Sequence, residues 1–259
     1  MAISSWLLLP LVVVLLIATM SALSAARTAG QLSPEGARKL FHVAMGTMTL
    51  SFPWLFIDPT PVLLLAGLCC VWFESVRRLT WFARHCGPVL SAVARPGRGE
   101  IYFVLGTALT FLLCGGNALA FVLPMAILTW ADTAAALVGQ RLGGRPGALR
   151  IGGKSLAGSG AFFVVALTIS LLGLSLAGWP PAQASLLSML LASTTTVLEA
   201  LARRGADNLL IPVGAALLLR GIVDPTQLPG SVATAFCITT FTITVISAFT
   251  VWRAREMKS

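Results

Sequence analysis

Charged residues are scarce in this sequence. Only 10% of its 259 residues are Asp, Glu, Lys or Arg, while 57% are hydrophobic and the mean hydropathy is +0.89. Soluble domains carry about 25% charged residues, so this scarcity excludes an ordinary water-soluble protein. Apolar runs of about 20 residues, long enough for a helix to cross a bilayer, follow one another along the chain. We therefore expect one all-α, polytopic membrane domain over residues 1–259, with no separate soluble domain.

The sequence also lacks paired cysteines and a typical secretion signal. It contains no C-x-x-C pair, and most of its five cysteines lie in apolar runs, which favours buried thiols over metal ligands or disulfides. The cysteines are Cys69, Cys70, Cys86, Cys114 and Cys237. The N-terminal apolar run, residues 6–26, has no basic residue before it and exceeds the usual length of about 7–15 residues of a cleaved signal. We expect it to be retained as an anchor helix within residues 1–30.

Nine apolar segments are candidate membrane spans, of which the second, fourth and eighth are short or weak. They cover residues 5–26, 40–57, 60–79, 100–117, 118–139, 155–178, 183–202, 207–223 and 229–252. If all nine cross, 17 of the 18 basic residues lie on one side and Arg220 alone lies on the other. Lys and Arg are retained on the cytoplasmic side of membranes. The sequence thus predicts a bundle of 8–9 spans with its N-terminus outside and its C-terminus in the cytoplasm.

The same distribution explains the net charge of +9. A basic chain can be a nucleic-acid binder, but such proteins carry their basic residues in a patch or stripe. Here these residues are spread over the loops of one side, which fits membrane topology, so we expect no nucleic acid as a partner.

Acidic residues number only nine, and seven of them fall on the predicted cytoplasmic side. Two of these seven, Glu35 and Glu256, are expected in loops or tails without a function. The other five lie within or at the ends of apolar spans: Glu74, Glu100, Asp132, Glu199 and Asp207. A charge at membrane depth costs about 2.5–3.5 kcal/mol on insertion scales, so it usually faces a polar cavity or a partner. Asp132 is the strongest candidate, because its small neighbours permit close helix packing.

A basic, glycine-rich loop over residues 139–155 leads into a helix that is expected to begin near Ser155. Free backbone N–H groups at a helix N-terminus, together with Lys154, can bind an anion. The loop is not a P-loop, because Ala148 occupies the position of the first glycine and no strand is expected before it. Taken alone, such a loop is more often a flexible basic connector than an anion site.

Two further groups of charges are expected on the same face. Arg38 and Lys39 lie about one helical turn before His42, and Glu74 and Arg77 are spaced i, i+3, close enough to pair. Each arrangement also has a local explanation, such as an ion pair or an interfacial base.

A third group surrounds the turn between two spans. Glu199 closes one span and Asp207-Asn208 begins the next, so two carboxylates converge on the Arg203-Arg204 turn. A helix cap would explain either carboxylate alone, but all three groups converge on one membrane face.

Four sequence blocks occur in a fixed order along residues 35–220. They are Arg38-Lys39-x-x-His42-x-x-x-Gly46, Asp132-x-x-Ala135-x-x-x-Gly139-x-x-x-Gly143, Lys154-Ser155-x-x-Gly158-Ser159 and Glu199-x7-Asp207-Asn208-x-x-x-Pro212. This set resembles the phytol kinase and dolichol kinase family, which are CTP-dependent polyprenol kinases related to the phosphatidate cytidylyltransferases. Members of the family often have Gly-Asp where this chain has Ala131-Asp132. The resemblance identifies residues 35–220 as a kinase-like core.

The resemblance implies transfer of the terminal phosphate of CTP to a membrane-embedded isoprenoid alcohol, such as phytol or another polyprenol. It implies Mg²⁺ as cofactor, held by Asp132, Glu199 and Asp207, with Lys154 on the phosphates and Asp132 or His42 accepting the proton of the alcohol. The implied nucleotide-binding residues are Arg38, Lys39, Arg77, Gly139, Gly143, Ser155, Gly158, Ser159 and Asn208, supported by Glu74 and Glu100.

Two other functions stay open. A phosphatidate cytidylyltransferase would use CTP and Mg²⁺ on the same face but transfer the nucleotidyl group to make CDP-diacylglycerol, and we find no convincing C-terminal signature of that family. A transporter or membrane scaffold would not be an enzyme, and transporters commonly have repeat-related halves, which we do not find. The acceptor alcohol, the donor and the oligomeric state are not defined by the sequence.

Overall fold

A computed structural model describes residues 5–90, 97–143, 149–151 and 154–223 of the chain. Its helices are α1 (Ser5–Thr28), α2 (Pro34–Thr49), α3 (Phe52–Leu55), α4 (Pro59–Arg78), α5 (Thr80–His85), α6 (Gly99–Cys114), α7 (Ala118–Ala126), α8 (Asp132–Gly143), α9 (Leu156–Leu176), α10 (Pro181–Leu201) and α11 (Asp207–Val223). A 3₁₀ turn, η1 (Gly87–Val89), follows α5, and a π-helical turn, η2 (Ile127–Ala131), joins α7 to α8. The helical fold agrees with the prediction.

The described residues contain one small exception to the all-helical prediction. Strands β1 (Arg150–Ile151) and β2 (Lys154–Ser155) form an antiparallel ladder in which Arg150 lies opposite Ser155. This two-residue ladder brings Lys154 to the start of α9. It is not the buried strand that precedes a P-loop.

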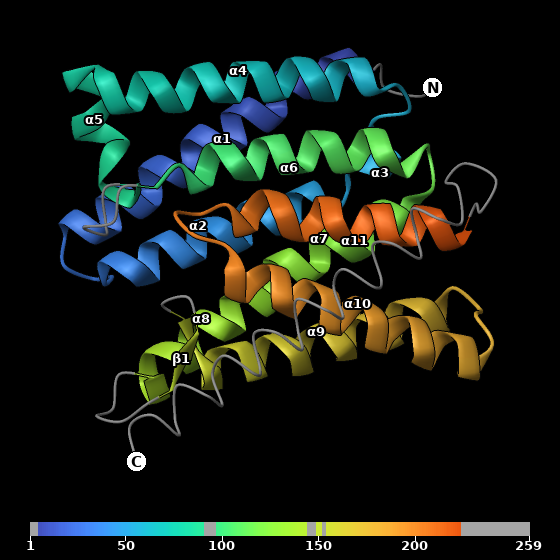
Figure 1. Cartoon of the computed structure of the whole chain (residues 1–259). Coiled ribbons are helices and arrows are strands. Elements are labelled where there is room, and N and C mark those ends of the chain that lie inside the picture. The colour runs from blue at the N-terminus through green and yellow to red at the C-terminus, as the bar shows by residue number, and fades with distance from the viewer. Residues whose placement is uncertain (1–4, 91–96, 144–148, 152–153, 224–259) are drawn as a thin grey trace.

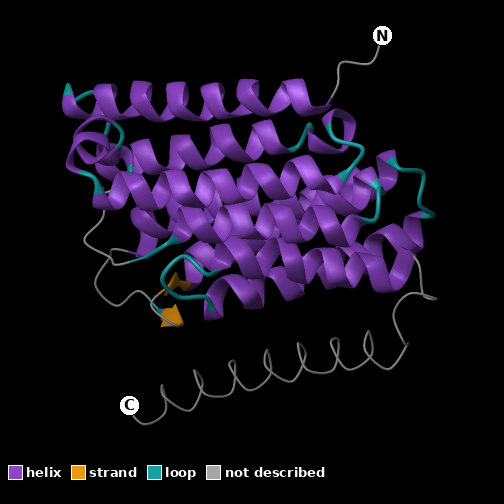
Figure 2. Cartoon of the chain, turned by 90° about the horizontal axis from the view of Figure 1, so that it is seen from above, coloured by secondary structure: helices purple, strands orange, loops and turns teal. Residues whose placement is uncertain are grey.

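The long helices lie side by side with their axes in similar directions (Figures 1 and 2). On one side of the bundle, α9 packs against α8 and α10. Helix α11 packs against α10 and also against α6. On the other side of α6 lies α4, and α1 packs against both α2 and α4. The N-termini of α2 and α6 and the C-termini of α4 and α8 consequently lie at one end of the bundle (Figure 1).

Among the residues that the structure describes, five helices are long and apolar enough to cross a membrane, as expected for an integral membrane protein. They are Trp6–Thr28, Pro59–Arg78, Ala118–Leu142, Leu156–Leu176 and Pro181–Leu201, with Gly99–Cys114 as a shorter apolar helix. The number of crossings and the orientation of the termini stay predictions. The predicted ninth span, residues 229–252, lies outside the described residues.

The predicted second span, residues 40–57, is wrong in its bounds. Helix α2 begins at Pro34, where the Ser33 hydroxyl caps it by accepting a hydrogen bond from the Gly36 N–H at 3.1 Å. It ends at Thr49, because Pro53 has no N–H to donate to the carbonyl of Thr49. The chain therefore breaks after α2 and continues as the short helix α3.

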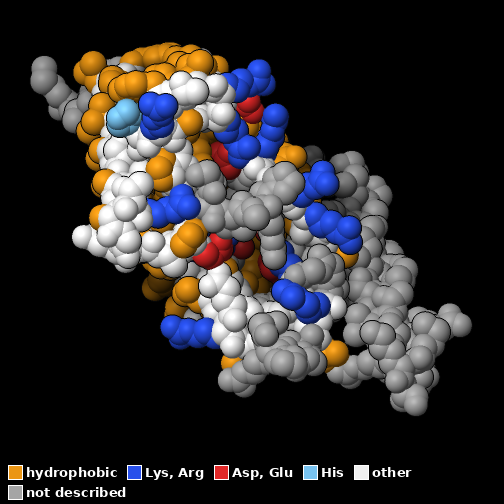
Figure 3. Space-filling model, turned by 90° about the vertical axis from the view of Figure 1, so that its left-hand side faces the viewer, with side chains coloured by type: hydrophobic (Ala, Val, Ile, Leu, Met, Phe, Trp, Pro, Cys, Tyr) orange, Lys and Arg blue, Asp and Glu red, His pale blue; other side chains and the backbone are white. Residues whose placement is uncertain are grey.

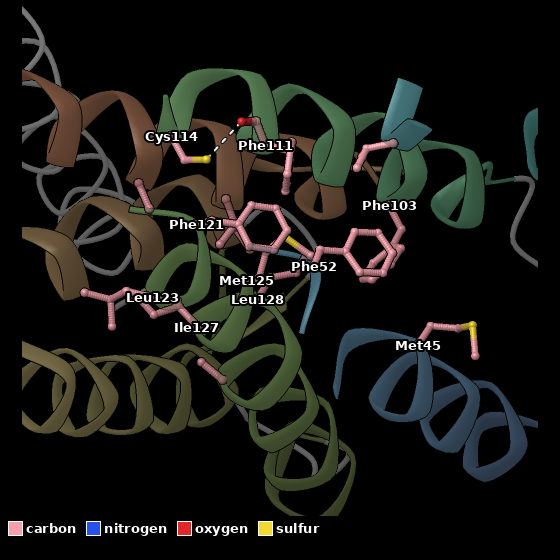
Figure 4. Packing of buried hydrophobic residues seen from close by; sticks show 14 of the residues in the cluster. Met45, Phe52, Phe103, Phe111, Cys114, Phe121, Leu123, Met125, Ile127 and Leu128 are labelled. Carbon is pink, nitrogen blue, oxygen red and sulfur yellow. Dashed lines mark hydrogen bonds between the residues drawn. The ribbon is translucent and has the colours of Figure 1, made fainter. Parts of the chain in front are cut away.

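Aromatic side chains of three helices form the centre of the hydrophobic core (Figure 4). The ring of Phe121 on α7 stacks on Phe52 of α3 at 6.4 Å between centroids and meets Phe111 of α6 edge-on at 5.3 Å. Met125 and Leu128, which follow Phe121 along α7 and η2, are fully buried. This packing fixes α3, α6 and η2 relative to one another, and η2 in turn positions Asp132.

Candidate active site

Charged side chains gather at one end of the bundle. Seen from that end, Lys and Arg side chains surround a hollow in which acidic side chains are visible (Figure 3). A cavity of about 1060 Å³ lies here, and residues from α2, α6, α8, α9, α10 and α11 border it. The predicted convergence is thus observed for Lys39, Asp132, Lys154, Glu199 and Asp207, which all border this cavity.

The first half of the site is built around Asp132, the residue that follows η2. Its carboxylate forms a buried ion pair with Lys39 of α2, whose Nζ also donates to the Asp132 carbonyl at 3.3 Å. The Nε2 atom of His42 lies 3.7 Å from the same carboxylate and 3.3 Å from the carbonyl of Leu128. A carbonyl can only accept, so Nε2 carries a hydrogen in this contact, and in the neutral form of the ring the lone pair lies on Nδ1.

A close approach between α2 and η2 makes this cluster possible. A Cβ atom on Gly46 would lie 2.1 Å from the hydroxyl oxygen of Thr129. Any side chain at Gly46 would therefore push α2 away from η2, and Lys39 and His42 would lose their contacts with Asp132.

The second half of the site is built around Lys154. Its Nζ lies 2.7 Å from Glu199 at the end of α10 and 2.8 Å from Asp207 at the start of α11. Ser159 of α9 donates a hydrogen bond of 3.0 Å to Glu199, which is only 2% exposed. Burial disfavours the charge of Lys154, but the carboxylates of Asp207, Glu199 and Asp132 outweigh it and hold its pKa above the ordinary value of 10.5. Lys154 is therefore a permanent ammonium held between two carboxylates.

Glycines hold the two halves together where α8 crosses α9. A Cβ atom on Gly158 would lie 2.8 Å from the Ala135 carbonyl, and one on Gly139 would lie 3.0 Å from the Ser155 hydroxyl oxygen. The same hydroxyl caps α9 by accepting from the Gly158 N–H at 3.1 Å, which confirms the predicted helix start. The crossing glycines of the second and third sequence blocks therefore have a packing role, whatever they contact in a ligand.

The predicted pairing of Glu74 with Arg77 is wrong. Glu74 pairs with Arg78, one residue further along α4, at 3.1 Å and with Arg98 at 3.4 Å. Arg77 instead pairs with Glu100 and donates to the Gly97 carbonyl at 2.6 Å. These ion pairs hold α4 against the start of α6. Glu100 borders the cavity, whereas Glu74 and Arg77 do not.

Most other predicted residues lie at the cavity, although some have structural partners. Arg38 forms an ion pair of 2.5 Å with Glu35. Glu35 was expected in a loop, but it lies in the first turn of α2 and borders the cavity. The Asn208 side-chain amide donates a hydrogen bond of 2.8 Å to the carbonyl of Gly99 and so holds α11 against α6. Gly143 is the last residue of α8.

Four residues at the rim of the cavity were not predicted as site residues. They are Gln140, Arg150, Arg203 and Arg204. All four are exposed, and each lies within a segment that the sequence had singled out: the glycine-rich loop or the turn between Glu199 and Asp207. Their position beside a carboxylate or a loop glycine was the available signal.

Away from the charged end, the cavity continues as an apolar arm. It is lined by residues of α1, α2, α3, α4 and α6, among them Val12, Met45, Phe52, Val62 and Phe103. Met45 of α2 lies across from Phe103 of α6 (Figure 4). The charged end, with its two clusters of lysine and carboxylate groups, and the apolar arm are thus parts of one continuous cavity.

Comparison with known proteins gives one significant relative. The phytol kinase of Synechocystis sp. (strain ATCC 27184 / PCC 6803 / Kazusa) is 28% identical to this chain over 193 residues, which cover 72% of the chain and 79% of the relative. The chain is a distant relative of phytol kinase. This relationship confirms the resemblance that the four sequence blocks predicted. No family model and no solved structure matches the chain.

The relationship to phytol kinase raises the question of whether the carboxylates fit a metal ion. Within the described ranges, no three His, Cys, Asp or Glu side chains are grouped as a metal site. Glu199 and Asp207, however, both contact Lys154 and border the cavity. Mg²⁺ is usually bound by one or two carboxylates together with substrate phosphates. The pair Glu199–Asp207 fits such a shared site, whereas Asp132 is neutralised separately by Lys39.

Proposed function

We propose that this protein transfers the terminal phosphate of CTP to an isoprenoid alcohol in the membrane. The observation that carries the proposal is the single cavity that joins a cluster of lysines and carboxylates to an apolar arm. Phosphoryl transfer to a lipid alcohol needs both environments in contact, because the donor is a polyanion and the acceptor is mostly hydrocarbon. The distant relationship to phytol kinase supports a kinase that acts on such an alcohol. CTP as donor rests on the family resemblance of the sequence blocks.

Lysine and arginine side chains would hold the phosphates of the nucleotide. Lys154 is already charged and its Nζ borders the cavity, and Arg38, Arg150 and Arg203 lie at the rim. Arginine binds phosphate through paired N–H groups, while lysine acts as a point charge, so the set can both attract the nucleotide and orient it. Binding of the phosphates would compete with the carboxylates for Lys154.

The carboxylates would serve two purposes. Glu199, oriented by Ser159, and Asp207 would hold Mg²⁺, which when bound would offset the negative charge on the transferring phosphate. Asp132 lies on the other side of the site, where Lys39 and His42 fix its position.

In the transfer step, the alcohol oxygen forms a bond to the terminal phosphorus while the bond from that phosphorus to the bridging oxygen breaks. The nucleoside diphosphate leaves, and the hydroxyl proton passes to a base in the cavity. The carboxylate of Asp132 and the Nδ1 atom of His42 are the two candidates, and both residues border the cavity between its charged end and its arm. Proton acceptance by a positioned side chain typically contributes about 10²–10⁴-fold to such a rate.

The charged end would face the cytoplasm, where the nucleotide is found. The basic loops predict this orientation, because Lys and Arg are retained on that side. The apolar arm would then extend from the membrane surface toward the bilayer interior, at the depth where the chain of a lipid alcohol lies.

The test uses the purified full chain in lipid with Mg²⁺, mixed prenols, phosphatidate and CTP labelled at the α- or the γ-phosphate. The proposal expects the γ label to appear in a prenyl phosphate. The α label in lipid, with release of pyrophosphate, would instead identify a cytidylyltransferase. No transfer from CTP, ATP, GTP or UTP would contradict the proposal and favour a transporter or scaffold. The double variant Lys39→Met/Asp132→Asn, which is expected to be inactive, gives the background level of label transfer.

A further inference from the structure

The apolar arm of the cavity runs along the helix axes from the charged end to Phe52. On α2 it is bordered by His42 near the charged end and by Thr49 seven residues later, a rise of about 10 Å. On α4, which runs in the opposite direction, it extends from Phe73 to Val62, a rise of about 16 Å. The arm is therefore a long, narrow space along the helix axes.

The arm presents hydrocarbon to whatever fills it. Among the described residues that line it beyond His42, the only hydroxyl groups belong to Thr49 and Thr107. Thr49 donates to the Gly46 carbonyl at 2.7 Å, and Thr107 donates to the Phe103 carbonyl at 2.9 Å. Since both hydroxyls are bonded within their own helices, a ligand in the arm meets no unsatisfied polar group. A single unbranched or methyl-branched hydrocarbon chain fits this lining, and a polar ligand would lose its hydration without replacement.

A fixed aromatic group closes the arm. Phe52 borders the cavity and is only 3% exposed. Its ring lies between Phe121, stacked at 6.4 Å, and Phe56, edge-on at 5.1 Å. Phe56 and Phe121 are themselves fully buried and do not line the cavity, so they support Phe52 from behind. A ring held on both sides in a close-packed core cannot move aside for a longer ligand without strain.

We propose that Phe52 sets the length of the acceptor alcohol. The inference rests on the proposed function and adds the specificity-determining residue. The hydroxyl lies at the charged end beside Asp132 and His42, the hydrocarbon chain runs between α2 and the α4–α6 pair, and its last carbon meets the ring of Phe52. An alcohol that is one isoprenoid unit longer than the one that fills the arm cannot place its hydroxyl beside Asp132, because the Phe52 ring blocks the extra carbons.

The test compares wild type with Phe52→Ala on a series of prenols that differ by one isoprenoid unit. Specificity is measured as the ratio of kcat/KM for the best wild-type acceptor to that for the alcohol one unit longer. The ratio is expected to fall about tenfold or more in Phe52→Ala, because truncation opens space beyond the arm. Phe162→Ala is the matched control: Phe162 is equally buried on α9 but does not line the cavity, so its ratio stays unchanged. Ala66→Leu, which narrows the arm halfway along α4, should shift the preference toward shorter alcohols.

A second measurement does not depend on turnover. A prenol with a diazirine at its far end is photolysed with the protein in lipid, and labelled peptides are identified by mass spectrometry. Label in peptides that contain Phe52 or Val62, removed by an excess of unlabelled prenol, supports the inference.

The two measurements separate the inference from the proposed function. If wild type phosphorylates prenols but the kcat/KM ratio is unchanged in Phe52→Ala, the role of Phe52 is overturned and the proposed kinase stands. The same holds if unlabelled prenol does not remove the diazirine label. If no prenol is phosphorylated but the diazirine labels the arm, the proposed kinase is wrong while the lipid-binding arm stands. If both measurements fail, both proposals are wrong.

Discussion

At the scale of single residues, the charges of the site are paired with one another inside the protein. Lys39 pairs with Asp132, and Lys154 pairs with both Glu199 and Asp207, so two ammonium groups face three carboxylates. Removing one partner of a buried pair leaves an uncompensated charge and typically costs about 3–5 kcal/mol. Activity and stability are therefore coupled in single substitutions at this site, and only paired substitutions separate them.

The pair Lys39–Asp132 provides such a separation. Asp132→Asn is expected to abolish detectable phosphoryl transfer and also to lower the stability of the protein by about 3–5 kcal/mol, because Lys39 stays buried without a counter-charge. The double variant Lys39→Met/Asp132→Asn should recover most of the stability and none of the activity. Thermal unfolding in detergent and γ-label transfer are the two readouts. Activity in the double variant would exclude Asp132 from the chemistry.

Lys154 gives a pH prediction. Its pKa in the folded protein is raised above 10.5, so its ionic contribution to stability is fully present below about pH 10.5 and is lost only as the pH rises through the higher folded value. The difference in unfolding temperature between wild type and Lys154→Met should consequently be constant from about pH 6 to pH 9. A difference that declines within this window would mean that Lys154 loses its proton there and that the two carboxylates do not hold it.

At the scale of elements, close helix crossings position the functional groups. Gly46 lets α2 approach η2, and Gly139 and Gly158 let α8 approach α9. The π-helical turn η2 lies directly before Asp132, and π-helical turns are frequent at functional sites. The helix pairs that carry Lys39, Asp132 and Lys154 are thus fixed by residues that need not touch a substrate.

Gly158→Ala tests the crossing of α8 and α9. The added Cβ would lie 2.8 Å from the Ala135 carbonyl and 3.3 Å from the Cα atom of Gly139, so the helices must separate. We expect a loss of about 1–3 kcal/mol in stability and a marked loss of activity. Gly160→Ala, on the same helix two residues away, meets nothing within 4 Å and should be neutral or stabilising by up to about 1 kcal/mol. Equal effects of the two substitutions, measured by thermal unfolding and γ-label transfer, would contradict the packing role.

The sequence predicted elements and caps better than contacts between them. The cap of α9 at Ser155 and the helices α1, α4, α6, α9, α10 and α11 follow from local patterns, because caps and hydrophobic runs act over a few residues. The ion pair of Lys39 with Asp132 joins residues 93 positions apart, and no local pattern specifies it. The same limit explains the wrong pairing of Glu74 with Arg77: helical spacing permitted it, but Glu100 on α6 lies closer to Arg77 in the folded chain.

At the scale of the whole molecule, charge is distributed along the bundle axis. The charged end carries both halves of the site, while the opposite end has loops such as the one at Asp58, which only caps α4. A bundle that crosses a membrane with this asymmetry presents a strongly charged end of its described residues on one side and a weakly charged end on the other.

The orientation of the bundle is therefore directly measurable. Single cysteines at Gln140 or Arg203, both exposed at the charged end, and at Asp58, exposed at the other, are introduced after the native cysteines are replaced by serine. In intact cells, a membrane-impermeant thiol reagent should label the cysteine at position 58 and spare those at 140 and 203, because the basic loops predict that the charged end lies in the cytoplasm. Permeabilised cells should label all three, which shows that each site is reactive. Labelling of positions 140 and 203 in intact cells would place the charged end outside, away from cytoplasmic nucleotides, and would leave the proposed kinase without its donor.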